Sequence, residues 1–123
     1  ILAKMMNSHP QYSVAMEEIH HTEKKDAPSG TAITLAKGIL ENYSHKTSWA
    51  NHHTDQPEIL EIISKREPNV PGTHSIRYTS AEDFIEIKHE AFSRKGFALG
   101  AVLAAEFVQN KKGIFGMNDL LNL

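Results

Sequence analysis

The chain of 123 residues (13.8 kDa) has the length of one domain, and 40% of its residues are hydrophobic and 23% charged. That composition is ordinary for a globular protein. There is no cysteine, which excludes disulfides and cysteine-ligated metal centres and is compatible with the reducing cytoplasm, where we expect the protein. The net charge is −2 without a basic stripe, and no apolar run approaches a membrane span, so we expect neither nucleic acid nor a membrane as partner.

The first half of the chain predicts two helices and a strand. Residues 1–6 have the pattern of a helix end, and because the chain starts inside this pattern we expect it to be a piece of a longer protein. Residues 13–19 predict a strand with alternate residues, Val14, Met16 and Glu18, on one face. After a polar segment at 20–29, apolar residues at helical spacing predict a helix from Thr31. Residues 42–57 are expected to be a polar loop.

Three further strands and a helix follow. Strands are predicted at 58–65, 73–80 and 82–91, and a second apolar helical stripe runs from Phe97 to Val108. The order α-β-α-β-β-β-α predicts an α+β (α/β) fold, a mixed β-sheet of about four strands with helices packed on one face. We expect the other face to be paired in an oligomer; the alternative is a monomer with one solvated sheet face.

Most of the chemistry-bearing residues lie between the first strand and the second helix. Ser29, Gly30 and Thr31 stand at the predicted helix N-terminus, where free backbone N–H groups and two hydroxyls form a site for an anion. His20, His21, Lys24 and Lys25 come just before, so a substrate with carboxylate or phosphate groups is expected. Histidine titrates near neutrality and can transfer a proton.

A purely structural interpretation stays open for each of these groups. Asp26 or Ser29 can simply cap the helix, and a His-His pair is often a feature of a surface loop. Arg66 is a candidate for the second end of a dicarboxylate, and a surface salt bridge is its alternative role. Trp49 is either a loop anchor or an interface contact.

The same segment resembles the signature of the dihydrodipicolinate reductases, the 4-hydroxy-tetrahydrodipicolinate reductases of lysine and diaminopimelate synthesis, through the ungapped pattern Glu18-x-His20-x3-Lys24-x-Asp26-x-Pro28-Ser29-Gly30-Thr31. Later segments resemble this family too, among them Arg66 with Gly72 and His74, and His89-Glu-Ala-Phe-Ser93-Arg94. The resemblance covers essentially the whole chain. Ala15 departs from it, because the family signature usually starts with a glutamate at that position.

The resemblance implies a two-domain oxidoreductase, of which residues 1–123 are the C-terminal substrate-binding and tetramerisation domain. NADPH or NADH would be bound by an N-terminal nucleotide-binding domain, and the glycines here indeed lack the G-x-G-x-x-G pattern. By resemblance, His20 and Lys24 are catalytic proton-transfer residues, and the substrate is a small dicarboxylate. Its binding residues would be His21, Ser29, Gly30, Thr31 and Arg66. We expect a homotetramer through the sheet, and no reduction by this chain alone.

Two other functions remain as alternatives. One is a non-catalytic assembly module that uses only the sheet interface. The other is a His-based metal-binding domain, because the chain has eight histidines and three of them, His45, His52 and His53, fall in one loop. Neither a His-x3-His pair on a helix nor an H-E-x-x-H motif is present, so we expect no functional metal.

Overall fold

In the computed structural model, which describes residues 1–123, the strand β1 (Ser13–His20) is the centre of a five-stranded sheet. The strand order is β2-β3-β1-β4-β5. β1 and β2 each pair in parallel with β3, whereas β1–β4 and β4–β5 are antiparallel. The mixed α+β sheet is therefore confirmed, with bounds β2 (Ser48–Ala50), β3 (Ile59–Arg66), β4 (Gly72–Thr79) and β5 (Phe84–Ala91).

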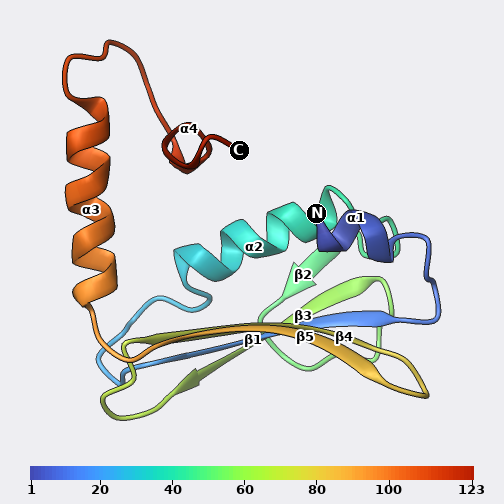
Figure 1. The fold of residues 1–123 in the computed structure, drawn as a ribbon. Helices are drawn as coiled ribbons and strands as arrows, with labels where there is room; N and C mark the ends of the chain where they lie inside the picture. The colour runs from blue at the N-terminus through green and yellow to red at the C-terminus, as the bar shows by residue number, and fades with distance from the viewer. The chain divides into compact units, whose positions relative to one another are not determined.

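The core lies between the sheet and two helices, α1 (Leu2–Met6) and α2 (Gly30–Leu40), which cover the same face (Figure 1). α2 buries its small side chains, so the helix backbone can approach the strands closely. The alternating residues of β1 that point to this face are apolar in its first half and ionisable in its second half. The buried apolar residues are Ala3, Met6, Val14, Met16, Ala32, Ala36, Ile39, Tyr43, Leu60, Ile62 and Tyr78.

The chain divides into two compact units, Ile1–Ala91 and Phe92–Leu123. The second unit consists of α3 (Lys95–Val108) and α4 (Met117–Leu121), neither of which buries a residue. Within it, the rings of Phe107 and Phe115 meet edge to face with their centroids 5.7 Å apart. None of the helices is both long enough and apolar enough to cross a membrane.

The short strand β2 departs from the expectation that residues 42–57 form a loop throughout. Its three residues pair with the start of β3 and include Trp49. Three residues are too few to show a periodic pattern, so this strand is fixed by its neighbours rather than by local sequence. One neighbour is Lys46, which is 7% exposed and donates from Nζ to the carbonyls of Pro57 (2.7 Å) and Ile59 (2.9 Å).

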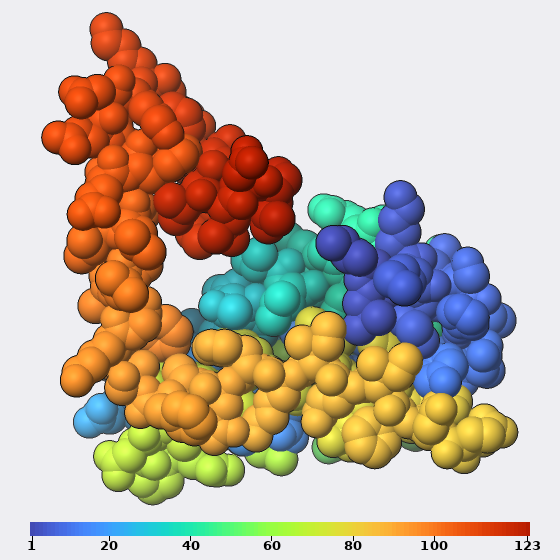
Figure 2. Space-filling model, viewed as in Figure 1, coloured from blue at the N-terminus to red at the C-terminus, as the bar shows by residue number.

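The face of the sheet opposite the helices is polar. Glu17 pairs with Lys65 at 2.5 Å, and Arg77 pairs with Glu86 at 2.9 Å. Ala15, the departure from the family signature, is on this face because β1 residues alternate between the two sides. In Figure 2 the edge strand β5 can be followed along its length in yellow-orange, and all but the last of its residues are exposed.

We expect Lys46→Met to lower the free energy of unfolding by about 2 kcal/mol, because it removes a buried ammonium that donates to the carbonyls of Pro57 and Ile59. Urea unfolding, followed by the fluorescence of Trp49, measures this change. Trp49 is the only tryptophan and lies in β2, close to Lys46 in the sequence. Lys25→Met, the same change at an exposed loop position, is the control and should leave the midpoint unchanged. Equal midpoints for both variants would show that Lys46 does not secure the segment.

Candidate active site

The ionisable residues gather at the carboxyl end of β1, where the chain leaves the sheet for α2. The register places Glu18 directly between Ser64 of β3 and His74 of β4, and it places His20 beside Arg66. Because strand residues alternate, Glu18 and His20 share the core-facing side with Val14 and Met16. Four elements thus bring their side chains to one end of the sheet: β1, β3, β4 and the N-terminus of α2.

Glu18 is 0% exposed and is the hydrogen-bond acceptor at the centre of this cluster. The amide of Ser29 donates to both carboxylate oxygens, at 3.0 and 3.2 Å, and the Ser64 hydroxyl donates to Oε1 at 2.6 Å. Burial alone would raise the pKa of Glu18, but the bonds from Ser29 and Ser64 outweigh it and hold that pKa below its usual value. The carboxylate is therefore charged at neutral pH.

The predicted anion site at the N-terminus of α2 divides into one buried residue and two exposed residues. Ser29 is the N-cap, with its Oγ accepting from the Ala32 amide at 3.2 Å and lying 3.1 Å from Nε2 of His74. Ser29 is buried, and its amide and hydroxyl are both used inside the protein, so the capping role is confirmed. Gly30 and Thr31 are exposed, and their amides have no partner within the chain.

His20 is nearly buried, with its Nδ1 3.6 Å from Oε2 of Glu18. Its ring meets that of His74 edge to face, with centroids 5.0 Å apart. Burial lowers the pKa of both imidazoles, and the Glu18 carboxylate opposes this by favouring the protonated forms. Gly72 packs on the other side of His20, and a Cβ at that position would lie only 3.3 Å from Nε2 of His20.

The loop between β1 and α2 is held by Arg66. Its guanidinium donates to the backbone carbonyls of Lys24 (3.2 Å) and Asp26 (2.6 Å), so it is more than a surface salt bridge. Lys24 in turn pairs with Asp26 at 2.9 Å, and its side chain is 21% exposed. The Nδ1 of His21 is buried without a hydrogen-bond partner. The loop therefore presents an ammonium and an imidazole beside the cluster.

All the predicted site residues fall on this end of β1, but sequence reasoning misses two members of the cluster. Ser64 gives no signal, since a serine within a strand is unremarkable without the register. His74 belongs to the family resemblance, which gives it no role. A sequence cannot say which residue of one strand lies opposite a given residue of another, and that pairing makes both of them partners of Glu18.

A metal-like donor set is present at a place that the sequence does not predict. Glu18, His20 and His74 each offer a ligand atom, all within 4.8 Å of one another. The Glu18 oxygens already accept from Ser29 and Ser64, however, and Nε2 of His74 lies 3.1 Å from Ser29 Oγ, so two of the three groups already have partners within the protein. In the predicted histidine loop, His45 contacts the carbonyl of Asn7, whereas His53 pairs with Glu61 at 3.3 Å.

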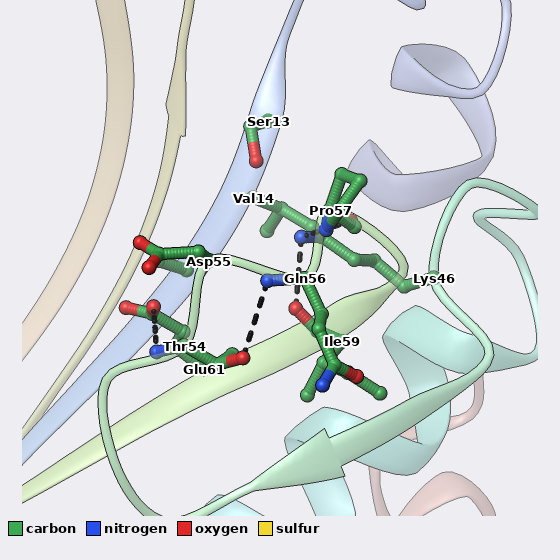
Figure 3. A pocket seen from close by; sticks show the side chains of 10 residues that line it. Ser13, Val14, Lys46, Thr54, Asp55, Gln56, Pro57, Ile59 and Glu61 are labelled. Atoms are coloured by element: carbon green, nitrogen blue, oxygen red, sulfur yellow. Dashed lines mark hydrogen bonds between the residues drawn. The ribbon is translucent and has the colours of Figure 1, made fainter.

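A cavity of about 300 Å³ lies elsewhere in the first unit (Figure 3). It is lined by the loop that follows Lys46 and by the beginnings of β1 and β3. The Thr54 amide donates to Glu61 at 2.7 Å there, and the Lys46 ammonium is already bonded to two carbonyls. Lys46 and Glu61 are thus already bonded within the protein, and we assign no site to this cavity.

Comparisons with known proteins agree with the fold. Residues 1–121 match the family described as "Dihydrodipicolinate reductase, C-terminus". The 4-hydroxy-tetrahydrodipicolinate reductase of Christiangramia forsetii is 56% identical over 121 residues, which are 98% of this chain and 50% of that protein. That of Thermosipho africanus is 39% identical over 119 residues, covering 96% of this chain and 46% of the relative.

A solved structure is similar as well. It is described as "Dipicolinate bound Dihydrodipicolinate reductase from Paenisporosarcina sp. TG-14" and is 26% identical, with a TM-score of 0.66, covering 96% of this chain and 48% of its own. The fold and site define an α+β domain that places a buried carboxylate–histidine cluster beside an open helix N-terminus. The chain belongs to the dihydrodipicolinate reductase C-terminal family, and it spans about half the length of these relatives.

Acid should destabilise this site in two steps. Below pH 6.5 the unfolded chain takes up protons that the buried His20 and His74 resist, so stability falls with pH; below pH 4.5 the same holds for Glu18. We expect His74→Gln to flatten the dependence of the urea midpoint between pH 6.5 and 5.5. The exposed His52→Gln should retain it, and identical slopes in both variants would contradict the assignment.

Proposed function

We propose that this chain is the part of a 4-hydroxy-tetrahydrodipicolinate reductase that binds the cyclic dicarboxylate substrate and supplies its proton-transfer groups. The observation that carries the proposal is the pair of unpartnered amides at Gly30 and Thr31, next to the cluster of His20, Glu18 and Lys24. An open helix N-terminus favours a carboxylate through its N–H groups and its partial positive charge. The similar reductase from Paenisporosarcina has dipicolinate bound, and dipicolinate is a ligand of this chemistry.

The proposed substrate lies with one carboxylate on the amides of Gly30 and Thr31, and the Thr31 hydroxyl donates a further bond. Its other carboxylate faces the cations of the preceding loop. Reduction of a C=N bond leaves the ring nitrogen in need of a proton. Lys24 holds a proton on Nζ, and His20 exchanges one through its ring, so these two residues are proposed as the catalytic acids. His21 contributes an imidazole to binding.

A nicotinamide dinucleotide does not fit the residues of this chain. Its phosphates need a glycine-rich turn between a strand and a helix. The strand-to-helix segment here has a proline and a buried, internally bonded serine before its single glycine, Gly30. We therefore assign NADPH or NADH binding to a part of the protein outside these 123 residues. We also propose that the protein assembles into a homotetramer through the polar face of the sheet. Its proposed location is the cytoplasm.

Titration calorimetry with pyridine-2,6-dicarboxylate tests the binding site. We expect Thr31→Val to weaken binding about tenfold, because a hydroxyl bond to a charged carboxylate contributes about 1.5 kcal/mol. Thr79→Val, at an exposed position near the end of β4, is the matched control and should bind like the unaltered chain. If the unaltered chain takes up no dicarboxylate, the alternative of a pure assembly module is favoured.

The location of the cofactor site has its own test. The 123-residue chain alone should not consume NADPH or NADH in the presence of substrate. A chimera in which it replaces the matching half of the Christiangramia forsetii reductase should consume the cofactor, because the two sequences are 56% identical over 121 residues. In the chimera, His20→Ala should lower kcat by about 100-fold or more, in line with loss of a proton-transfer group. Cofactor consumption by the isolated chain would overturn the assignment.

A further inference from the structure

Glu18 is too deeply buried to touch a substrate, yet it is the most connected charge in the site. Glu18 is 0% exposed. Its neighbours in the adjacent strands are Ser64 and His74, and both side chains turn toward its carboxylate. Removing a carboxylate from water costs several kcal/mol unless hydrogen bonds replace the lost solvent. The core of a sheet usually has an apolar residue such as leucine or methionine at a position like this. A buried charge here therefore suggests a functional role.

One side of the carboxylate faces the N-terminus of α2, where the proposed anion site lies. The Ser29 amide donates to it at 3.0 Å, and the same residue caps α2 through the bond from the Ala32 amide to Ser29 Oγ. Gly30 and Thr31 lie between these two fixed points, so their free amides can move little. His74 adds a second restraint, with its Nε2 3.1 Å from Ser29 Oγ and 3.5 Å from the carboxylate.

The other side of the carboxylate faces His20. Nδ1 of His20 is buried without a hydrogen-bond partner and lies 3.6 Å from Oε2 of Glu18. The other charged or titratable groups that face this ring are His74 on β4, Lys24 in the loop and Arg66 on β3, and each of these favours its neutral form. Glu18 is thus the one neighbour that favours the protonated imidazole.

We propose that Glu18, supported by His74, is a positioning residue that fixes the substrate amides and the His20 ring to one another. The carboxylate accepts from the Ser29 amide and lies 3.6 Å from Nδ1 of His20, so a change in its place acts on the end of α2 and on the imidazole together. This inference rests on the proposed function for the identity of the ligand. The geometry that it describes is independent of that ligand.

The test is the protonation of His20, followed by NMR titration of its Cε1 proton in the full chain with EDTA present. In Glu18→Gln the charge is lost while the shape is kept, so the pKa of His20 should move further below its ordinary value. The affinity for pyridine-2,6-dicarboxylate should fall as well, because the end of α2 loses its bond to the carboxylate. Glu41→Gln, at the exposed C-cap of α2, is the matched control and should change neither.

A merely structural role predicts the opposite shift. If Glu18→Gln only loosens the site, His20 gains water and its pKa rises toward the ordinary value; that result, or no shift, would overturn the inference. Should Glu18→Gln not fold, Ser64→Ala removes one donor to the same carboxylate and keeps the charge. We then expect a dicarboxylate affinity several-fold weaker, and an unchanged affinity would count against the inference.

Failure of the proposed function gives a different pattern from failure of this inference. If the unaltered chain does not bind the dicarboxylate, the proposed function fails while the His20 titration still tests the Glu18 contact. If the unaltered chain binds and Glu18→Gln leaves both the affinity and the His20 titration as they were, the proposed function stands and the positioning role is wrong.

Discussion

The site depends on one buried negative charge in the centre of the sheet. The Glu18 carboxylate is stable there because an amide and a hydroxyl replace water around it, and those two donors come from α2 and β3. The carboxylate therefore works as a cross-link between the helix and the sheet. A helix held only by apolar packing could slide or tilt on the strands, whereas this one is held at its N-terminal end by a bond with defined direction.

The rest of the site follows from that attachment. With Ser29 turned inward to the carboxylate, the next two amides, those of Gly30 and Thr31, are the ones left free at the surface. The loop before them is held by Arg66, which bonds to the backbone of Lys24 and Asp26 rather than to their side chains. The Lys24 ammonium therefore stays available for its pair with Asp26, while its main chain is held by Arg66.

The sequence predicts the elements of this fold that have a periodic pattern and misses what depends on pairing. β1 and α2 have clear periods of two and 3.6 residues, and both predictions agree with the structure within one or two residues. The order of the strands, with β1 between β3 and β4, produces no local pattern in the sequence. For the same reason the motif-rich run from Glu18 to Thr31 is identifiable as the site, whereas Ser64 and His74, opposite Glu18 in the neighbouring strands, receive no role from the sequence.

The expected role of Ser29 shows how register changes the interpretation of a motif. In a linear pattern, Ser29-Gly30-Thr31 offers three adjacent amides and two hydroxyls to a ligand. In the fold, β1 places Glu18 below the first of these amides, and the serine becomes a part of the support. An internal carboxylate that neutralises the first amide also repels an anion, so a bound carboxylate is favoured one residue further along the helix. The buried charge thus holds the helix end in place, and it also limits where the proposed substrate can lie.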